Sequence, residues 1–237
     1  MPLTQSRRFS RILAACASLL IGALIVRSPL LRAEPAAIIP APKLDNAKAA
    51  GPLQKAVIAG GCFWGMQGVF QHVQGVKKVL SGYSGGERST AQYETVSTGT
   101  TGHAESIEIT FDPAQISYGQ LLQIAFSVGF DPTQLNRQGP DSGTQYRSDI
   151  FYADDAQKNI ASAYIAQLNE VKAFHRPIVT RVDPLHGFFV AEDYHQDYLF
   201  LHPNQPYIAF NDIPKVENLK KVFPALYADR PMLVTAR

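Results

Sequence analysis

Cysteine is scarce in this chain, which has only Cys16 and Cys62 among its 237 residues. The two do not form a CxxC pair, and this argues against disulfide exchange as the chain's chemistry. If the N-terminal segment that holds Cys16 is removed, Cys62 has no partner within the chain and no internal disulfide can form. Any thiol chemistry of the mature chain therefore depends on Cys62 alone.

Several other common functional signatures are also missing. The sequence has no GxSxG, no P-loop and no dinucleotide-binding fingerprint after a predicted strand, so these nucleophile and nucleotide sites are not indicated. Its six histidines form no HxxxH pair and no cluster with cysteine, and we therefore expect no metal site. The net charge is +2 and no basic stripe is present, so nothing favours a nucleic-acid partner.

The first 33 residues have the composition of a targeting segment. They contain five arginines and no acid, and Arg7, Arg8 and Arg11 precede an apolar run of about 15 residues. A run of this length suits a signal peptide and is short for a membrane span. We predict that residues 1–33 are a signal peptide or an N-terminal membrane anchor. The protein is then expected to be exported to the periplasm, or an equivalent non-cytoplasmic compartment, or to be anchored by its N-terminus.

The rest of the sequence predicts one globular domain. Residues 34–54 are rich in alanine and proline and are predicted to be a linker. The domain itself is expected over residues 55–228, with a tail at residues 229–237. Predicted strands and helices are interleaved without strict alternation, which favours an α+β or two-layer α/β fold with a mixed sheet and helices packed on it. Residues 192–228 are predicted to be a loop-rich C-terminal tail with one helical piece.

Cys62 lies at a predicted junction between a strand and a helix. An apolar strand is predicted at residues 54–59, Gly60 and Gly61 make a turn, and apolar residues at helical spacing follow. The unpaired N–H groups and the dipole of a helix start favour a thiolate over a thiol. Cys62 is therefore a candidate nucleophile. The alternative is that it is a small buried hydrophobic residue, the usual place of a free cysteine.

Glu105 begins a predicted strand with clean alternation. Ile107, Ile109 and Phe111 share one face of it, Glu105 is in phase with them, and Glu108 points to solvent. An acid drawn into apolar surroundings has a raised pKa, which is what a proton donor at neutral pH requires. The alternative is that Glu105 lies beyond the strand end and is simply solvated.

Residues 60–65, Gly-Gly-Cys-Phe-Trp-Gly, resemble the signature of the A-type peptide methionine sulfoxide reductases. The resemblance covers about residues 55–226. Many blocks in the right order make it specific; they are residues 82–86, 102–105, 111–113, 131–134, 136–139, 143–148 and 191–196. It implies a two-layer α/β fold built around a ferredoxin-like core. It also implies reduction of the S-epimer of methionine sulfoxide, free and in oxidised proteins, and hence protein repair.

The resemblance also implies a role for each matching residue. Cys62 corresponds to the nucleophile and Glu105 to the acid that protonates the sulfoxide oxygen, in a site shielded from water. The remaining matches are Tyr93 and Tyr146, which hydrogen-bond that oxygen, Phe63 and Trp64, which form the methyl pocket, and Asp141, which holds substrate or a water. No resident cofactor is implied, and the expected protein is a monomer.

The sequence departs from many members of this family at one important point. Those members carry resolving cysteines near the C-terminus, and some carry one where Ser97 stands, but this chain has none after Cys62. We therefore predict a single-cysteine subtype. Its Cys62 sulfenic acid is expected to be recycled by an external thiol such as thioredoxin, glutaredoxin or glutathione.

Two other functions are compatible with a lone reactive cysteine. One is a different thiol oxidoreductase, such as a peroxidase, which would turn over hydrogen peroxide and not methyl sulfoxides. The other is a non-catalytic module that senses redox state or binds sulfoxides without releasing methionine. The presence of Glu105, Tyr93 and Tyr146 argues against the second.

Overall fold

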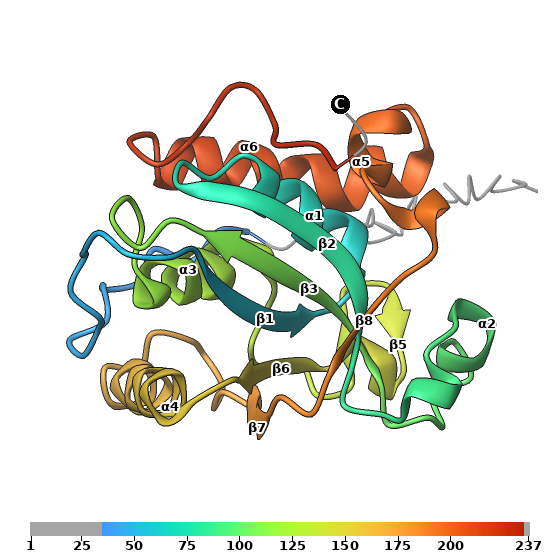
Figure 1. The fold of residues 1–237 in the computed structure, drawn as a ribbon, viewed down its shortest axis with the longest axis horizontal. Helices are drawn as coiled ribbons and strands as arrows, with labels where there is room; N and C mark the ends of the chain where they lie inside the picture. The colour runs from blue at the N-terminus through green and yellow to red at the C-terminus, as the bar shows by residue number, and fades with distance from the viewer. Residues whose placement is uncertain (1–34, 235–237) are drawn as a thin grey trace, which may run out of the picture. The chain divides into compact units, whose positions relative to one another are not determined.

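The computed structural model describes residues 35–234. The predicted signal peptide or anchor at residues 1–33 lies outside the described residues. Within residues 35–234, no helix is both long enough and apolar enough to span a membrane. Figure 1 shows the described part of the chain as a twisted sheet with helices packed on it.

A six-stranded sheet in the order β7-β6-β1-β3-β2-β8 forms the body of the domain. Its strands are β1 Gln54–Gly60, β2 Val76–Ser84, β3 Ala104–Phe111, β6 Ser148–Tyr152, β7 Arg181–Pro184 and β8 Phe188–Val190. Neighbouring strands are antiparallel except β6 and β7, so the sheet is mixed. The four central strands, with one helix after β1 and another after β3, follow the βαββαβ plan of the ferredoxin-like fold. The predicted fold class is confirmed.

The main hydrophobic core lies between one face of the sheet and four helices. These are α1 Phe63–Gln71, α3 Tyr118–Ile124, α4 Asp155–Glu170 and α6 Ile213–Val222. The alternation predicted for β3 is present, because Ile107, Ile109 and Phe111 are fully buried in this core. Burying each such side chain stabilises the fold by about 1.5–3 kcal/mol. Helices α1 and α6, far apart in sequence, lie side by side (Figure 1).

The opposite face of the sheet carries a smaller apolar cluster. Val57 and Ala59 of β1 pack there with Ala104 and Phe151. Strand β1 is thus buried on both faces, which explains why its sequence is continuously apolar instead of alternating. This central position fixes the end of β1, where Cys62 follows.

Two helices begin at side-chain caps. Helix α3 starts with a capping box, in which Ser117 Oγ accepts from the Gln120 N–H and the Gln120 side chain accepts from the Ser117 N–H. Helix α4 starts at Asp154, whose carboxylate accepts from the Gln157 N–H at 2.8 Å. Each cap contributes about 0.5–2 kcal/mol.

Short elements fill the predicted loops. Within residues 131–146, strands β4 Arg137–Gln138 and β5 Asp141–Ser142 form a small hairpin. The C-terminal tail is more helical than its sequence indicated. The other short elements are α2 Tyr93–Val96, α5 Tyr198–Leu201, the 3₁₀ helices η1 Arg88–Thr90, η3 Thr144–Tyr146 and η4 Asp193–His195, and the π-helical turns η2 Ala125–Gly129 and η5 Ile208–Asp212.

The segment predicted as a linker packs on the domain from residue 35 onward. Its Pro40 carbonyl accepts from Tyr164 Oη at 2.8 Å, and the Asp45 carboxylate accepts from the Gly119 N–H at 2.8 Å. The side chain of Ile39 is only 6% exposed. The extended backbone needs partners for its polar groups, and side chains of α3 and α4 supply them. Residues of this segment are therefore held against α3 and α4 by these bonds.

Candidate active site

Cys62 is the N-cap residue of α1 and lies two residues after the end of β1, with Gly61 between them. The turn before it requires glycine twice. Gly61 has a φ of +84°, and a Cβ there would lie 2.5 Å from Gln138 Cβ. A Cβ on Gly60 would lie 2.2 Å from the ring of Phe130. The glycines thus let two neighbouring side chains close over the turn, and Cys62 is left 7% exposed.

The resting state of the Cys62 thiol differs from the sequence-based expectation. Burial raises the pKa of Cys62 well above its ordinary value, and the charges of Glu105 and Asp212 raise it further. The Trp64 N–H at the helix start lowers the pKa, as predicted, but by less than these effects combined. The expected preference for a thiolate is therefore wrong for the free protein, and the sulfur retains its proton.

Glu105 is buried beside Cys62, on the core face of β3 as its phase predicted. It is 3% exposed, and its Oε2 accepts from the Phe63 N–H at 3.1 Å. Burial raises the pKa of Glu105 from 4.5 to about 8, with smaller contributions from Asp141 and Asp212, while the Phe63 N–H lowers it. Glu105 is consequently protonated at neutral pH and can donate a proton.

The two tyrosines face the same site from different loops. Tyr93 begins α2 and Tyr146 ends η3, and each is half-buried. Burial raises the pKa of both phenols, and the charge of Glu105 is the next cause in each case. Both phenols therefore remain hydrogen-bond donors in the neighbourhood of Glu105.

The loop that carries Tyr146 is fixed by a buried arginine. Arg147 donates to the Thr144 carbonyl at 3.1 Å and to the Gly102 carbonyl at 3.0 Å. Its Nε donates to Asp149 Oδ2 at 3.0 Å. One guanidinium thus ties the end of this loop to the start of β3, which is the strand that carries Glu105.

Phe63 and Trp64 form an aromatic wall, with ring centroids 6.4 Å apart. Phe63 is buried and Trp64 is half-buried. The ring of Tyr198 stacks on Trp64 at 3.9 Å, and Tyr207 meets it edge-on at 6.1 Å. The indole Nε1–H donates to His195 Nδ1 at 3.1 Å. The wall therefore presents apolar ring faces, and these contacts fix the orientation of the Trp64 indole.

Asp141 lies on β5 at the same site and accepts a hydrogen bond from Tyr207 Oη. Burial raises the pKa of Asp141, while the Tyr207 hydrogen bond and the charge of Lys215 lower it. Like Glu105, this acid is placed in a site poor in water. All seven residues proposed from the sequence thus lie on elements around Cys62.

The sequence reading missed the residues that the C-terminal tail contributes. Asp212 is fully buried, and a Cβ on Gly65 would lie 2.2 Å from its Oδ1. Lys215 Nζ lies 3.5 Å from the same oxygen. Burial raises the pKa of Asp212 to about 6, against the attraction of Lys215. Tyr207, Asp212 and Lys215 have no spacing that marks them, and Gly65 within the signature was the one available sign of a close neighbour.

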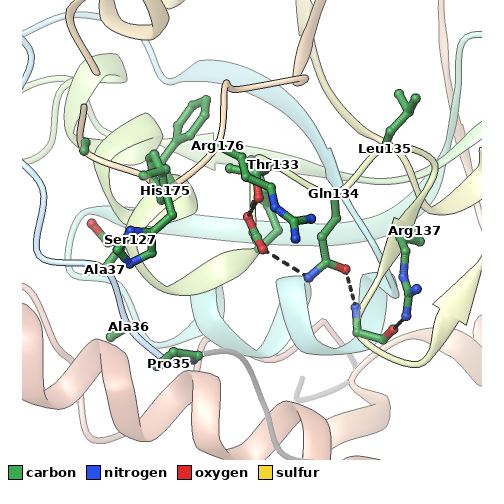
Figure 2. A pocket seen from close by; sticks show the side chains of 16 residues that line it. Pro35, Ala36, Ala37, Ser127, Thr133, Gln134, Leu135, Arg137, His175 and Arg176 are labelled. Carbon is green, nitrogen blue, oxygen red and sulfur yellow. Dashed lines mark hydrogen bonds between the residues drawn. The ribbon is translucent and has the colours of Figure 1, made fainter. Parts of the chain in front are cut away.

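A separate cavity of about 920 Å³ lies beneath the hairpin that bears Asp141, and neither Cys62 nor Glu105 lines it. Figure 2 shows Gln134 within it, bonded to the Asp131 carboxylate and to the Gly139 N–H. These hydrogen bonds hold residues 131–139 together. Because neither Cys62 nor Glu105 lines this cavity, the reaction is not placed there.

No group of three histidine, cysteine, aspartate or glutamate side chains able to hold a metal ion occurs within residues 35–234. The functional groups at the site are instead a thiol, a protonated acid, phenols and an aromatic wall. On an α+β scaffold, this combination defines an enzyme of the thiol-dependent oxidoreductase class, with general-acid assistance.

The family model for peptide methionine sulfoxide reductase matches residues 54–226, and the chain belongs to this family. Two relatives bear the names peptide methionine sulfoxide reductase MsrA 2. The protein from Mesorhizobium japonicum is 61% identical over 187 residues, which cover 79% of this chain and 96% of the relative. The protein from Synechocystis is 52% identical over 189 residues, covering 78% and 88%. The chain is thus an oxidoreductase that acts on methionine sulfoxide.

Two solved structures share the fold. Reduced Mxr1 from Saccharomyces cerevisiae superimposes with a TM-score of 0.58 at 31% identity, covering 69% of this chain and 91% of that one. Methionine sulfoxide reductase A of Corynebacterium diphtheriae gives a TM-score of 0.56 at 29% identity, covering 77% and 92%. Both place the mixed sheet and its helices within the same family of enzymes.

Proposed function

We propose that this protein reduces the S-epimer of methionine sulfoxide, free and in oxidised proteins, with Cys62 as nucleophile and Glu105 as acid. The observation that carries the proposal is the state of Glu105. It is buried, protonated at neutral pH, and bonded to the backbone N–H of the residue that follows Cys62. A sulfoxide oxygen leaves only when it is protonated or strongly hydrogen-bonded, and this acid can supply the proton.

The reaction balances with one thiol and no added reductant. Glu105 gives its proton to the sulfoxide oxygen as the sulfur of Cys62 attacks the sulfoxide sulfur, and the thiol proton returns to the Glu105 carboxylate. The oxygen passes to Cys62 when its bond to the substrate sulfur breaks. Methionine sulfur is reduced by two electrons, and Cys62 is oxidised to a sulfenic acid.

The surrounding residues then have separate tasks. The phenols of Tyr93 and Tyr146 donate to the sulfoxide oxygen and stabilise the charge that develops on it. Phe63 and Trp64 receive the S-methyl group on their apolar faces. Asp141 holds the substrate or a water from its place on β5. Recognition of one sulfur epimer follows from fixing the oxygen and the methyl group in two different directions.

Recycling requires a second molecule, because Cys62 is the only cysteine in residues 35–234. An external thiol attacks the sulfenic acid, a mixed disulfide forms and water leaves. A second thiol then releases the Cys62 thiol and an external disulfide. Thioredoxin, glutaredoxin and glutathione are the candidate donors. We also propose export or N-terminal anchoring, supported by the composition of residues 1–33, and N-terminal sequencing of the native protein tests it.

A single-turnover assay without reductant tests the reaction. One methionine per enzyme should form from the S-epimer, and dimedone should label Cys62 as a sulfenic acid. Cys62→Ser should form no methionine, and Cys16→Ser, the matched control, should behave as the wild type. Turnover of hydrogen peroxide without turnover of methyl sulfoxides would overturn the proposal. A Cys16–Cys62 disulfide would overturn the single-cysteine cycle.

A further inference from the structure

We propose that His195 is a positioning residue whose neutral imidazole holds Trp64 in place, so that acid loosens the methyl pocket by protonating it. The inference rests on the proposed function, because it takes the face of Trp64 to be the substrate wall. It concerns how the wall is held and when it is released.

The contact between His195 and Trp64 determines the protonation state of the imidazole. His195 lies on η4 and is 2% exposed, and its Nδ1 faces the indole Nε1 at 3.1 Å. An indole N–H can only donate a hydrogen bond. Nδ1 must therefore hold a lone pair, and the imidazole proton resides on Nε2.

The rings around Trp64 make apolar contacts with it but no directional bond to its edge. Tyr198 stacks on the indole at 3.9 Å with an interplanar angle of 10°, which fixes the plane of Trp64, and Tyr207 meets the ring edge-on at 6.1 Å. The hydrogen bond from the edge of the indole to His195 supplies that directional contact. His195 is itself held by the rings of Phe63 at 5.0 Å and Tyr93 at 4.5 Å.

Protonation of His195 would turn this bond into a conflict. Nδ1 would then carry a hydrogen that faces the indole N–H, so two donors would meet in a buried site. Burial lowers the pKa of His195, and the charge of Glu192 raises it by less. Neutral imidazole is therefore the state near pH 7, and the charged state forms only in acid.

The charged and titratable groups around His195 are few. The Glu192 carboxylate lies 3.9 Å from its Nε2 and is itself engaged by Tyr83 Oη and the Tyr93 N–H, at 2.9 Å each. The phenols of Tyr93 and Tyr194 pack against the imidazole, with Tyr194 at 4.2 Å. Within residues 35–234, Glu192 is thus the only carboxylate found against His195, and it also anchors the start of α2. One short segment therefore orients both Trp64 and Tyr93.

The fluorescence of Trp64, the sole tryptophan of the chain, reports on this bond without any need for turnover. We expect the emission of the wild type to change as the pH falls from about 6.5 towards about 4.5, because burial places the pKa of His195 below its ordinary value. The KM for a methyl sulfoxide should rise about tenfold with the same midpoint, while kcat should change less. An emission that stays constant over this range would overturn the proposal, and this measurement needs no core substitution.

Two substitutions separate the hydrogen bond from the imidazole charge. His195→Asn keeps an acceptor near the position of Nδ1 and cannot titrate, so the midpoint of the wild type should disappear from both emission and KM. His195→Leu removes the acceptor, and its KM should be about tenfold higher at every pH. A wild-type KM in His195→Leu would overturn the proposal. So would a wild-type midpoint in His195→Asn, since Asp212, with a pKa of about 6, would then be its source.

Two exposed histidines serve as controls. His202 packs on Tyr198 at 4.3 Å and could influence Trp64 through that ring, whereas His186 is remote from the stack. His186→Asn and His202→Asn should both keep the wild-type midpoint, and its loss in His202→Asn would overturn the assignment to His195. If the protein lacks reductase activity while the midpoint follows His195, the proposed function fails and the positioning role remains. If activity is present and emission does not titrate, only the positioning role fails.

Discussion

The two faces of the sheet treat a buried acid in opposite ways. Glu105, on β3, lies on the helix-covered face. Asp149, on β6, lies on the opposite face, where it pairs in register with Ala59 of β1. Ala59 in turn pairs with Ser106, the neighbour of Glu105. Both acids are almost completely buried. Asp149 has Arg147 at 3.0 Å and Arg181 at 4.0 Å, whereas the strongest recorded partner of Glu105 is a backbone N–H.

This difference in pairing separates the roles of the two acids. Burial raises the pKa of Glu105 to about 8 and that of Asp149 only to about 6, because the two arginines pull the latter back down. Glu105 keeps a proton that it can donate. Asp149 keeps a charge that anchors Arg147 and, through it, the loop of Tyr146. A carboxyl group buried without a neighbouring cation thus keeps its proton and can donate it. A carboxyl group buried beside arginines keeps its charge and holds those arginines in place.

Glu105→Gln should give the largest effect. The amide that replaces the carboxyl group is an uncharged near-isostere that cannot donate an acid proton, so we expect kcat to fall by about 10²–10⁴ while substrate affinity changes little. Single-turnover rates and sulfoxide binding measure the two quantities. A wild-type rate would remove Glu105 from the role of acid.

Glu105→Gln should also change how the free energy of unfolding depends on pH. The pKa of Glu105 is raised from 4.5 to about 8, so the folded state holds a proton that the unfolded state releases between these values. The stability contribution is present below about pH 4.5 and is lost as pH rises through about 8, a difference of up to about 5 kcal/mol. Relative to wild type, Glu105→Gln should therefore be more stable at pH 9 than at pH 5 in urea unfolding. An equal difference at both pH values would contradict the raised pKa.

Asp149→Asn should lower the stability of the protein and leave its chemistry largely unchanged. It leaves the buried Arg147 without its carboxylate, and we expect a loss of about 3–5 kcal/mol in the free energy of unfolding. The folded fraction should retain far more activity than Glu105→Gln. Chemical denaturation and the kcat of folded enzyme test this, and a rate loss as large as that of Glu105→Gln would mean that Asp149 takes part in the chemistry.

Glu108→Gln, on the same strand as Glu105, should have the smallest effect. The Glu108 side chain is only 14% exposed, less than its predicted position in solvent, and it pairs with Lys55 at 2.9 Å. Because Lys55 is 61% exposed, the pair is open to water and should contribute about 0–1 kcal/mol. Neither kcat nor the pH dependence of stability should change. A large effect here would show that position on β3, and not the surroundings of each acid, decides the outcome.

Local patterns in the sequence predicted the parts of the molecule that depend on local order. The alternation in β3 placed Glu105 on the core face, and the two glycines after the first predicted strand marked the turn before Cys62. The sign of the Cys62 pKa shift could not be predicted this way, since it depends first on the burial of the thiol and then on three acids from separate elements. Neither Asp212 nor the packing of residues 35–49 follows a period that a sequence displays.

The π-helical turn Ile208–Asp212 determines the direction in which the Tyr207 and Asp212 side chains point. In this turn the Ile213 N–H donates to the Ile208 carbonyl, five residues earlier, where an α-helix would use the residue four earlier. The two site residues Tyr207 and Asp212 are likewise five apart. In a regular α-helix, residues five apart point about 140° away from each other, whereas a π turn brings them toward one face. The active site therefore depends on helical phase as well as on residue identity. Deleting the exposed Phe210 would leave the two residues four apart, and a regular α-helix also places such residues on one face. The π turn therefore accommodates an extra residue while both side chains still point into the site.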